Sequence, residues 1–180
     1  MIWQSTIDLT DDERAQLNAF ARQYEGSSEE FHPNVIAQFP SVLDKVNRKI
    51  DEYLPEKTEV LDTYHKYLTQ SWSINVSKNS MTPFNPHKHG YCHLSFVFYT
   101  ESNGEIPLVL TDCNNLETSY YLKTNDFIMI SPEQIHRIRD GHAPSERISF
   151  AGDLILTEKT YRSSLFLPPL KIWKQLEELK

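Results

Sequence analysis

Short β-prone segments follow one another closely through the second half of this 180-residue chain, and they constrain its fold more than any other feature. Each segment is rich in β-branched or aromatic residues and is bounded by turn-forming residues, and no helical periodicity separates them. Strands this short and closely spaced are typical of an antiparallel sandwich or barrel, so we predict a mainly β fold. The segments lie at residues 71–77, 94–100, 106–112, 118–123, 126–130, 136–139 and 146–157.

Two helices are predicted ahead of these strands. Thr10 followed by Glu13 matches a capping box, in which each side chain bonds the main-chain amide of the other residue, and apolar residues then recur on one face until about Gly26. The second helix is expected to begin with Ser41 as its N-cap and to end at Pro55. Its apolar stripe needs a partner surface, so we expect the helices to pack against one side of a sheet.

Length and pattern together indicate a single domain spanning residues 1–180. Within it we expect helical support at residues 1–68, a β core at 69–160 and a C-terminal extension at 161–180, where helical spacing resumes from residue 170. Residues 27–40 show no periodicity, and we expect this stretch to reach over a binding pocket as a lid.

Charge and hydropathy exclude several classes of protein. The chain carries 18 basic and 25 acidic residues, so we expect no broad nucleic-acid-binding surface. It has no long apolar run that could span a membrane and no basic-then-apolar leader, which predicts a cytoplasmic protein. In that compartment Cys92 and Cys113 are expected to stay reduced, with Cys92 in the core.

A histidine pair precedes one of the strongest β segments. His87 and His89 are two residues apart, so in an extended segment both imidazoles point to one face and can converge on one metal ion. Downstream, Ser131-Pro132 breaks a strand before a second one that carries His136. Such a unit can return His136 beside the first pair and form a three-histidine site. Three nitrogen ligands on one face leave positions open for a co-substrate and oxygen, which suits Fe(II).

Arg147 and Ser149 share one face of the last β segment. An arginine buried in a barrel keeps its charge, so the carboxylate of an incoming molecule is a natural partner. Ser149 would add a hydroxyl donor, and Tyr99, which shares the parity of the histidine pair if its strand is regular, is expected to line the same pocket. The alternative is a surface ion pair between Arg147 and one of the acids Glu146, Asp140 and Asp153.

The order of these motifs resembles that of a known group of enzymes. The matching pieces are SWSINV, PHKH, HLSFVFY, FIMISPEQIH and RISFAGD, within about residues 70–156. They resemble the Fe(II)- and 2-oxoglutarate-dependent oxygenases of the double-stranded β-helix fold, and more narrowly a bacterial and phage group with an H-x-H motif. The resemblance implies a jelly-roll or cupin-like core with the N-terminal helices packed on one side.

The resemblance also implies a site and a reaction. The three histidines would bind Fe(II). Arg147 and Ser149 would hold the distal carboxylate of the co-substrate 2-oxoglutarate, with Tyr99 in the same pocket. The reaction would consume molecular oxygen and hydroxylate an unidentified small-molecule or peptide substrate, with release of succinate and CO2.

Several alternatives stay open at the level of sequence. The larger superfamily has an acid where this chain has His89, so an acid elsewhere, such as Asp112, could complete the ligand set instead. His93 could line the pocket or cap a strand edge. A cupin-like three-histidine dioxygenase that does not use 2-oxoglutarate and a non-catalytic metal-binding β protein are the alternative functions. The oligomeric state is equally open, with a homodimer as one option.

Overall fold

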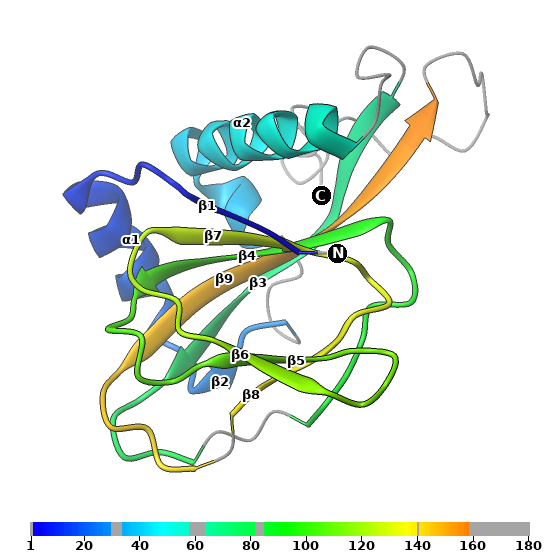
Figure 1. The fold of residues 1–180 in the computed structure, drawn as a ribbon. Helices are drawn as coiled ribbons and strands as arrows, with labels where there is room; N and C mark the ends of the chain where they lie inside the picture. The colour runs from blue at the N-terminus through cyan, green and yellow to red at the C-terminus, as the bar shows by residue number, and fades with distance from the viewer. Residues whose placement is uncertain (1, 30–33, 58–63, 82–84, 140, 159–180) are drawn as a thin grey trace.

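Two antiparallel sheets form the body of the molecule (Figure 1), whose computed structural model describes residues 2–29, 34–57, 64–81, 85–139 and 141–158. The mainly β fold predicted from the spacing of the segments is confirmed. The large sheet has the order β1-β7-β4-β9-β3-β2, with β1 (Ile2–Thr6), β7 (Asp126–Ile130), β4 (Leu94–Glu101), β9 (Arg147–Glu158), β3 (Tyr64–Val76) and β2 (Gly26–Ser27). The small sheet has the order β6-β5-β8, with β6 (Glu117–Tyr120), β5 (Leu108–Thr111) and β8 (Ile135–Ile138).

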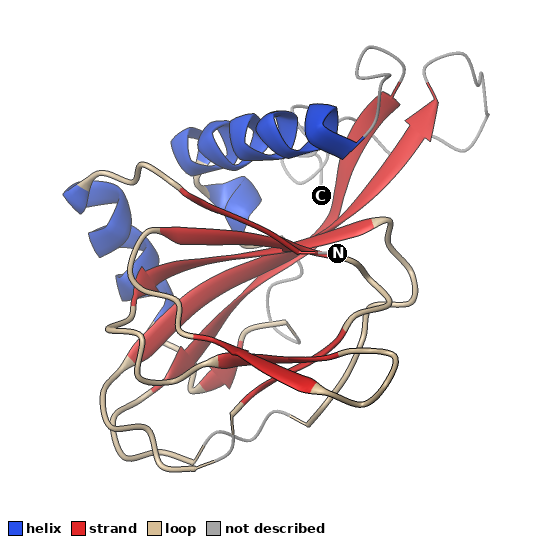
Figure 2. Ribbon diagram, in the orientation of Figure 1, coloured by secondary structure: helices blue, strands red, loops and turns tan. Residues whose placement is uncertain are grey.

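The helices lie together on one face of the large sheet, and the small sheet lies on the opposite face (Figure 2). This arrangement confirms the predicted packing of the N-terminal helices. Leu17, Val46 and Ile50, which lie on the inner faces of the helices, are fully buried against the large sheet. The helices are α1 (Asp11–Ala21), α2 (Pro40–Lys57) and the short 3-10 helix η1 (Ile36–Gln38).

Strand β4 shows how the large sheet is covered on both faces. Successive side chains of a strand point to opposite faces. Phe96 and Phe98 pack in the core shared with the helices, whereas Val97 and Tyr99 pack in the core between the two sheets. All four side chains are buried, which explains why this strand is apolar at successive positions instead of alternating with polar residues.

The helix boundaries differ in part from those expected. The capping box of Thr10 and Glu13 is present, which confirms the predicted start of α1. The end predicted near Gly26 is wrong, because α1 stops at Ala21 and Gly26 pairs with β3 in the short strand β2. The N-cap predicted at Ser41 is also wrong. Helix α2 already starts at the preceding proline, whose fixed φ suits a first helical position.

The predicted stop at Pro55 is wrong by two residues, because α2 continues to Lys57. A proline lacks its own amide donor, but its φ is helical, so a last turn can run past it. The strand β1, which pairs with β7, was not expected within residues 1–68. The expected division after residue 68 also cuts through β3, which begins at Tyr64.

The C-terminal extension at 161–180, with its expected helix from residue 170, lies outside the described residues. The single-domain organisation therefore stays a prediction. Among the described helices, none combines the length and the apolar character that crossing a bilayer requires. The expected cytoplasmic location stays a prediction as well.

Candidate metal centre and anion pocket

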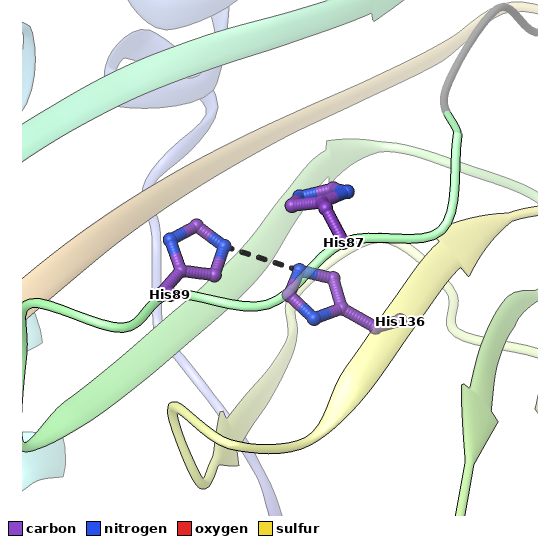
Figure 3. Close-up of side chains that lie close together, drawn as sticks. All are labelled: His87, His89 and His136. Atoms are coloured by element: carbon purple, nitrogen blue, oxygen red, sulfur yellow. Dashed lines mark hydrogen bonds between the residues drawn. The ribbon is translucent and has the colours of Figure 1, made fainter.

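Three histidines from two distant parts of the chain meet at one point (Figure 3). His87 and His136 face each other across an antiparallel bridge, with His87 donating its amide to the His136 carbonyl at 3.0 Å and the reverse bond at 2.9 Å. His89 donates its amide to the Pro132 carbonyl at 2.9 Å, so it is held against the turn between β7 and β8. One ring nitrogen from each of the three histidines lies within 4.8 Å of the other two.

Each imidazole is held through its Nδ1 atom. His87 Nδ1 lies 2.9 Å from the Asn85 carbonyl and His136 Nδ1 lies 3.0 Å from the Gln134 carbonyl. His89 Nδ1 lies 3.0 Å from Oδ2 of Asp153. These oxygens only accept hydrogen bonds, so each Nδ1 carries a proton, and Nε2 is the nitrogen that presents a lone pair in the neutral ring. This is the tautomer that a metal site needs.

A cluster of imidazole nitrogens of this kind suits the binding of a cation. The Nε2 atoms of His89 and His136 are 3.2 Å apart, a contact that is a hydrogen bond only when one of the two rings carries a second proton. Burial, opposed by the Gln134 carbonyl and reinforced by the neighbouring imidazoles, lowers the pKa of His136 to about 4. His136 is therefore neutral near pH 7. A divalent cation would convert the facing lone pairs into a favourable arrangement.

Behind His89 lies Asp153, which is 3% exposed. Its Oδ1 accepts a bond from Ser95 at 2.7 Å, and its Oδ2 accepts one from Gln70 at 2.6 Å in addition to the bond from His89. Burial alone would raise the pKa of Asp153, but these donors, His89 first among them, lower it below its usual value. Trp72 stacks on the His89 ring with the centroids 5.5 Å apart, so that imidazole is fixed from two directions.

Arg147 is buried at 2% exposure in the core between the sheets. Its Nη1 donates to Oγ of Ser149 at 3.2 Å and its Nη2 donates to the hydroxyl of Tyr99 at 3.0 Å. Its Nε is buried and has no hydrogen-bond partner among the described residues. Within the part of the chain that the structure describes, Arg147 forms no ion pair. A buried cation without a counter-ion is costly, and a bound anion would satisfy it.

One cavity of about 400 Å³ extends from the three histidines to Arg147. Its lining includes the three histidines together with Arg147 and Ser149. Alternate residues of β9 face into it, beginning with Arg147 and ending with Asp153, so one strand supplies both the guanidinium and the carboxylate behind His89. The space is sufficient for a small dicarboxylate between metal and arginine.

The other residues considered from sequence lie elsewhere. Asp112 is exposed at the β5–β6 turn, where its Oδ1 accepts the amides of Asn114 and Leu116. His93 caps a strand edge, because its Nδ1 accepts the Leu156 amide at 3.1 Å. Both lie outside the cavity lining.

The acids considered as partners of Arg147 are engaged elsewhere or not described. Glu146 pairs with Arg22, and Asp153 pairs with His89. Asp140 lies outside the described residues. Cys92, expected in the core, is half-buried, and burial raises the pKa of its thiol to about 11.

The stretch expected to act as a lid is only partly described. Ser27 and Glu29 line the cavity. Residues 30–33 lie outside the described part, and Val35 and Ile36 are fully buried in the core beneath the helices. The second half of the stretch therefore belongs to the core and not to a loop over the cavity.

Comparison of the sequence with protein-family models and with curated proteins gives no match. The structure, in contrast, resembles several solved ones. A viral collagen prolyl hydroxylase from Paramecium bursaria Chlorella virus-1 aligns with a TM-score of 0.56 at 17% identity, over 85% of this chain and 88% of that one. A Pseudomonas putida prolyl-4-hydroxylase aligns with 0.53 at 15% identity, over 84% and 86%. HygX from Streptomyces hygroscopicus, with nickel and 2-oxoglutarate bound, aligns with 0.58 at 8% identity, over 85% and 81%.

The fold is a double-stranded β-helix like that of these solved structures. The β-helix core predicted from the resemblance is thereby confirmed. Sequence reasoning placed His87, His89 and His136 together in this fold, and the structure brings them together. It named Asp153 only as a partner for Arg147 and overlooked Gln70. Strand parity would have found both residues, because Asp153 shares the face of Arg147 and Gln70 shares that of Trp72.

Proposed function

We propose that this protein is an Fe(II)- and 2-oxoglutarate-dependent oxygenase that hydroxylates a small-molecule or peptide substrate. One observation carries the proposal. Three clustered imidazoles and a buried arginine that pairs with no acid among the described residues line the same cavity. The first group suits a metal and the second suits a carboxylate, and 2-oxoglutarate is a ligand that needs both.

In this proposal His87, His89 and His136 would hold the iron through their imidazole nitrogens, and 2-oxoglutarate and dioxygen would bind at the remaining coordination positions. Arg147 receives the distal carboxylate of 2-oxoglutarate through a charge-assisted contact. Ser149, which accepts a bond from the guanidinium and lines the cavity, offers its hydroxyl to the same anion. Tyr99, expected to line the pocket, is fully buried outside the cavity lining, so its role is to orient the guanidinium through the bond that it accepts from Arg147. When bound, iron and 2-oxoglutarate would activate dioxygen for hydroxylation, with release of succinate and CO2.

The apolar part of the cavity lining serves this chemistry by excluding water. Val97, Leu108, Ile130 and Ala151 border the cavity and are buried. A dry wall strengthens the attraction between Arg147 and a carboxylate, because the interaction is not screened by solvent. It also favours a single orientation of the co-substrate.

A cupin-like dioxygenase is the second candidate, because the described residues give the centre three imidazoles and no carboxylate ligand. Such an enzyme would not use 2-oxoglutarate and would have no need of the buried Arg147. The arginine therefore favours the first candidate.

Anaerobic titration with Fe(II) and 2-oxoglutarate tests the proposal. Chelation of iron by the 2-oxo acid produces a visible charge-transfer band, which we expect to appear on adding both ligands and not with either alone. Iron binding without the band, even at saturating 2-oxoglutarate, would favour the cupin-like candidate. Failure to bind iron at all would contradict both. Succinate formation under air, with a panel of amino acids and peptides, would then identify the substrate class.

A further inference from the structure

The buried carboxylate of Asp153 contacts His89, one of the three histidines proposed to bind the metal. Asp153 Oδ2 accepts the Nδ1–H of His89 at 3.0 Å, while the cluster able to bind a metal directly consists, among the described residues, of the three histidines. The inference below rests on the proposed function, because it concerns the charge of the iron site.

The neighbours of Asp153 hold its carboxylate in place. Ser95, Gln70 and His89 donate three hydrogen bonds to its two oxygens, at 2.7, 2.6 and 3.0 Å. Among the described residues, no lysine or arginine forms an ion pair with Asp153, so these three donors, and His89 among them, are what compensates its charge. A buried charge needs such compensation.

The ligand set by itself carries no negative charge. Two imidazoles and one carboxylate reduce the charge of an Fe(II) site to about +1, whereas three neutral imidazoles leave it at about +2. A carboxylate hydrogen-bonded to the far nitrogen of a histidine makes that ring a more basic ligand. The carboxylate of Asp153 would act in this way on a metal held by His89.

We propose that Asp153 supplies, through His89, the negative charge that a carboxylate ligand would otherwise give this iron site. His89 and Asp153 together take the place of one acidic ligand. The role of Asp153 is positioning and electrostatic, because it touches His89 and not the reacting atoms.

The variant Asp153→Asn isolates the charge. Asparagine has the same shape, its amide oxygen can accept from His89 and Gln70, and its amide group can donate to Ser95, whose hydroxyl can rotate to accept. We expect Fe(II) affinity, measured anaerobically on the full chain, to fall by about 10- to 100-fold. We also expect the Fe(III)/Fe(II) reduction potential to rise, because the uncharged site stabilises Fe(III) less. A purely structural role would not move the potential.

The matched control is Asp12→Asn, which makes the same change in net charge at an exposed position in the first turn of α1. Its Fe(II) affinity and potential should equal those of the natural chain. Unchanged affinity and potential in Asp153→Asn would overturn the inference while leaving the metal site intact. If the natural chain binds no iron, the proposed function fails and the inference fails with it.

A second variant tests the same charge from the ligand position, with folding of both variants checked by circular dichroism. The double variant His89→Asp with Asp153→Asn moves the carboxylate into the ligand position and keeps the total charge of the site. We expect it to bind Fe(II) with a potential close to that of the natural chain. A folded double variant that binds no iron, or whose potential is far above that of the natural chain, would overturn the inference.

Discussion

His87 and His136 exchange both of their main-chain hydrogen bonds, although 49 residues separate them. In an antiparallel pair, residues that exchange both bonds stand directly opposite each other with their side chains on the same face. The two ring centroids are accordingly 4.4 Å apart. The backbone therefore sets the separation of these imidazoles before any metal arrives, and the Asn85 and Gln134 carbonyls fix the tautomers. The centre is preorganised.

Removing His136 should abolish metal binding. We expect His136→Ala to lose most bound Fe(II), because two remaining imidazoles, one of them exposed, hold a divalent ion weakly. The metal content of the purified protein measures this directly. Asp112→Ala removes the acid that the sequence offered as an alternative ligand and should retain its iron, because Asp112 only shapes an exposed turn. Full iron occupancy in His136→Ala would exclude His136 from the centre.

Removing Arg147 should weaken the co-substrate and spare the metal. We expect Arg147→Ala to reduce 2-oxoglutarate affinity by on the order of 2 to 3 kcal/mol, or about 30- to 140-fold, because a charge-assisted contact is lost. Fe(II) content should stay close to that of the natural chain, since none of the metal-binding nitrogens contacts Arg147. The charge-transfer band, titrated with 2-oxoglutarate, gives both quantities.

Arg22→Ala is the matched control for that experiment. Arg22 bonds Glu146 on the surface and lies outside the cavity, so its loss should leave the band unchanged. Equal 2-oxoglutarate affinity in the Arg147 variant would remove Arg147 from the anion pocket.

The parts of this fold that depend on local pattern could be predicted from sequence. The capping box of Thr10 with Glu13 needs only neighbours three residues apart, and the strand Asp126–Ile130 needs only its own β-prone residues and flanking turn. The histidine motif was readable for the same reason, because an H-x-H spacing has a fixed meaning in an extended segment.

What depends on pairing between distant segments was not predictable in the same way. Strand β1 exists because Trp3 and its neighbours pair with β7, and Trp3 packs edge-on against Phe127. Nothing within residues 2–6 alone specifies that partner. The carboxylate of Asp153 is similar. Its role depends on Ser95, the residue opposite it on β4, and on the His89 ring, which is distant in the sequence but in contact with it in the fold.

Glu13 should make stability depend on acid pH. Burial alone would raise its pKa, but bonds from Lys45, the Thr10 amide and Ser41 lower it from 4.5 to about 2. A carboxyl whose pKa is lower in the folded state stabilises that state above its unfolded pKa, and this contribution is lost as pH falls through the folded pKa. We expect Glu13→Gln to lower the free energy of unfolding by about 1 kcal/mol at pH 7. The difference should shrink between pH 4.5 and about 2.

Urea denaturation at several pH values measures this difference, and Glu52→Gln is its control. The Glu52 side chain pairs with Lys49 but is 51% exposed, against 13% for Glu13. An exposed pair of this kind contributes little, so the control should change stability by less than about 0.5 kcal/mol at any pH. A Glu13 effect that stays constant down to pH 3 would contradict the assignment to its ionised form.

Gly152 should tolerate no larger residue, because it lies where β9 passes over an aromatic ring. A Cβ atom there would stand 2.6 Å from Cζ and 2.8 Å from Cε1 of Phe96, whose ring is fully buried and stacked on Phe127. The ring cannot move aside without disturbing that core. We expect Gly152→Ala to lower the free energy of unfolding by about 1 to 3 kcal/mol, the usual cost of overpacking.

Gly90→Ala is the control, since its added Cβ would meet no atom within 4 Å. Urea denaturation should give a near-native midpoint for Gly90→Ala and a lower one for Gly152→Ala. Equal midpoints for the two variants would mean that β9 can shift away from Phe96, and with it Asp153 behind His89.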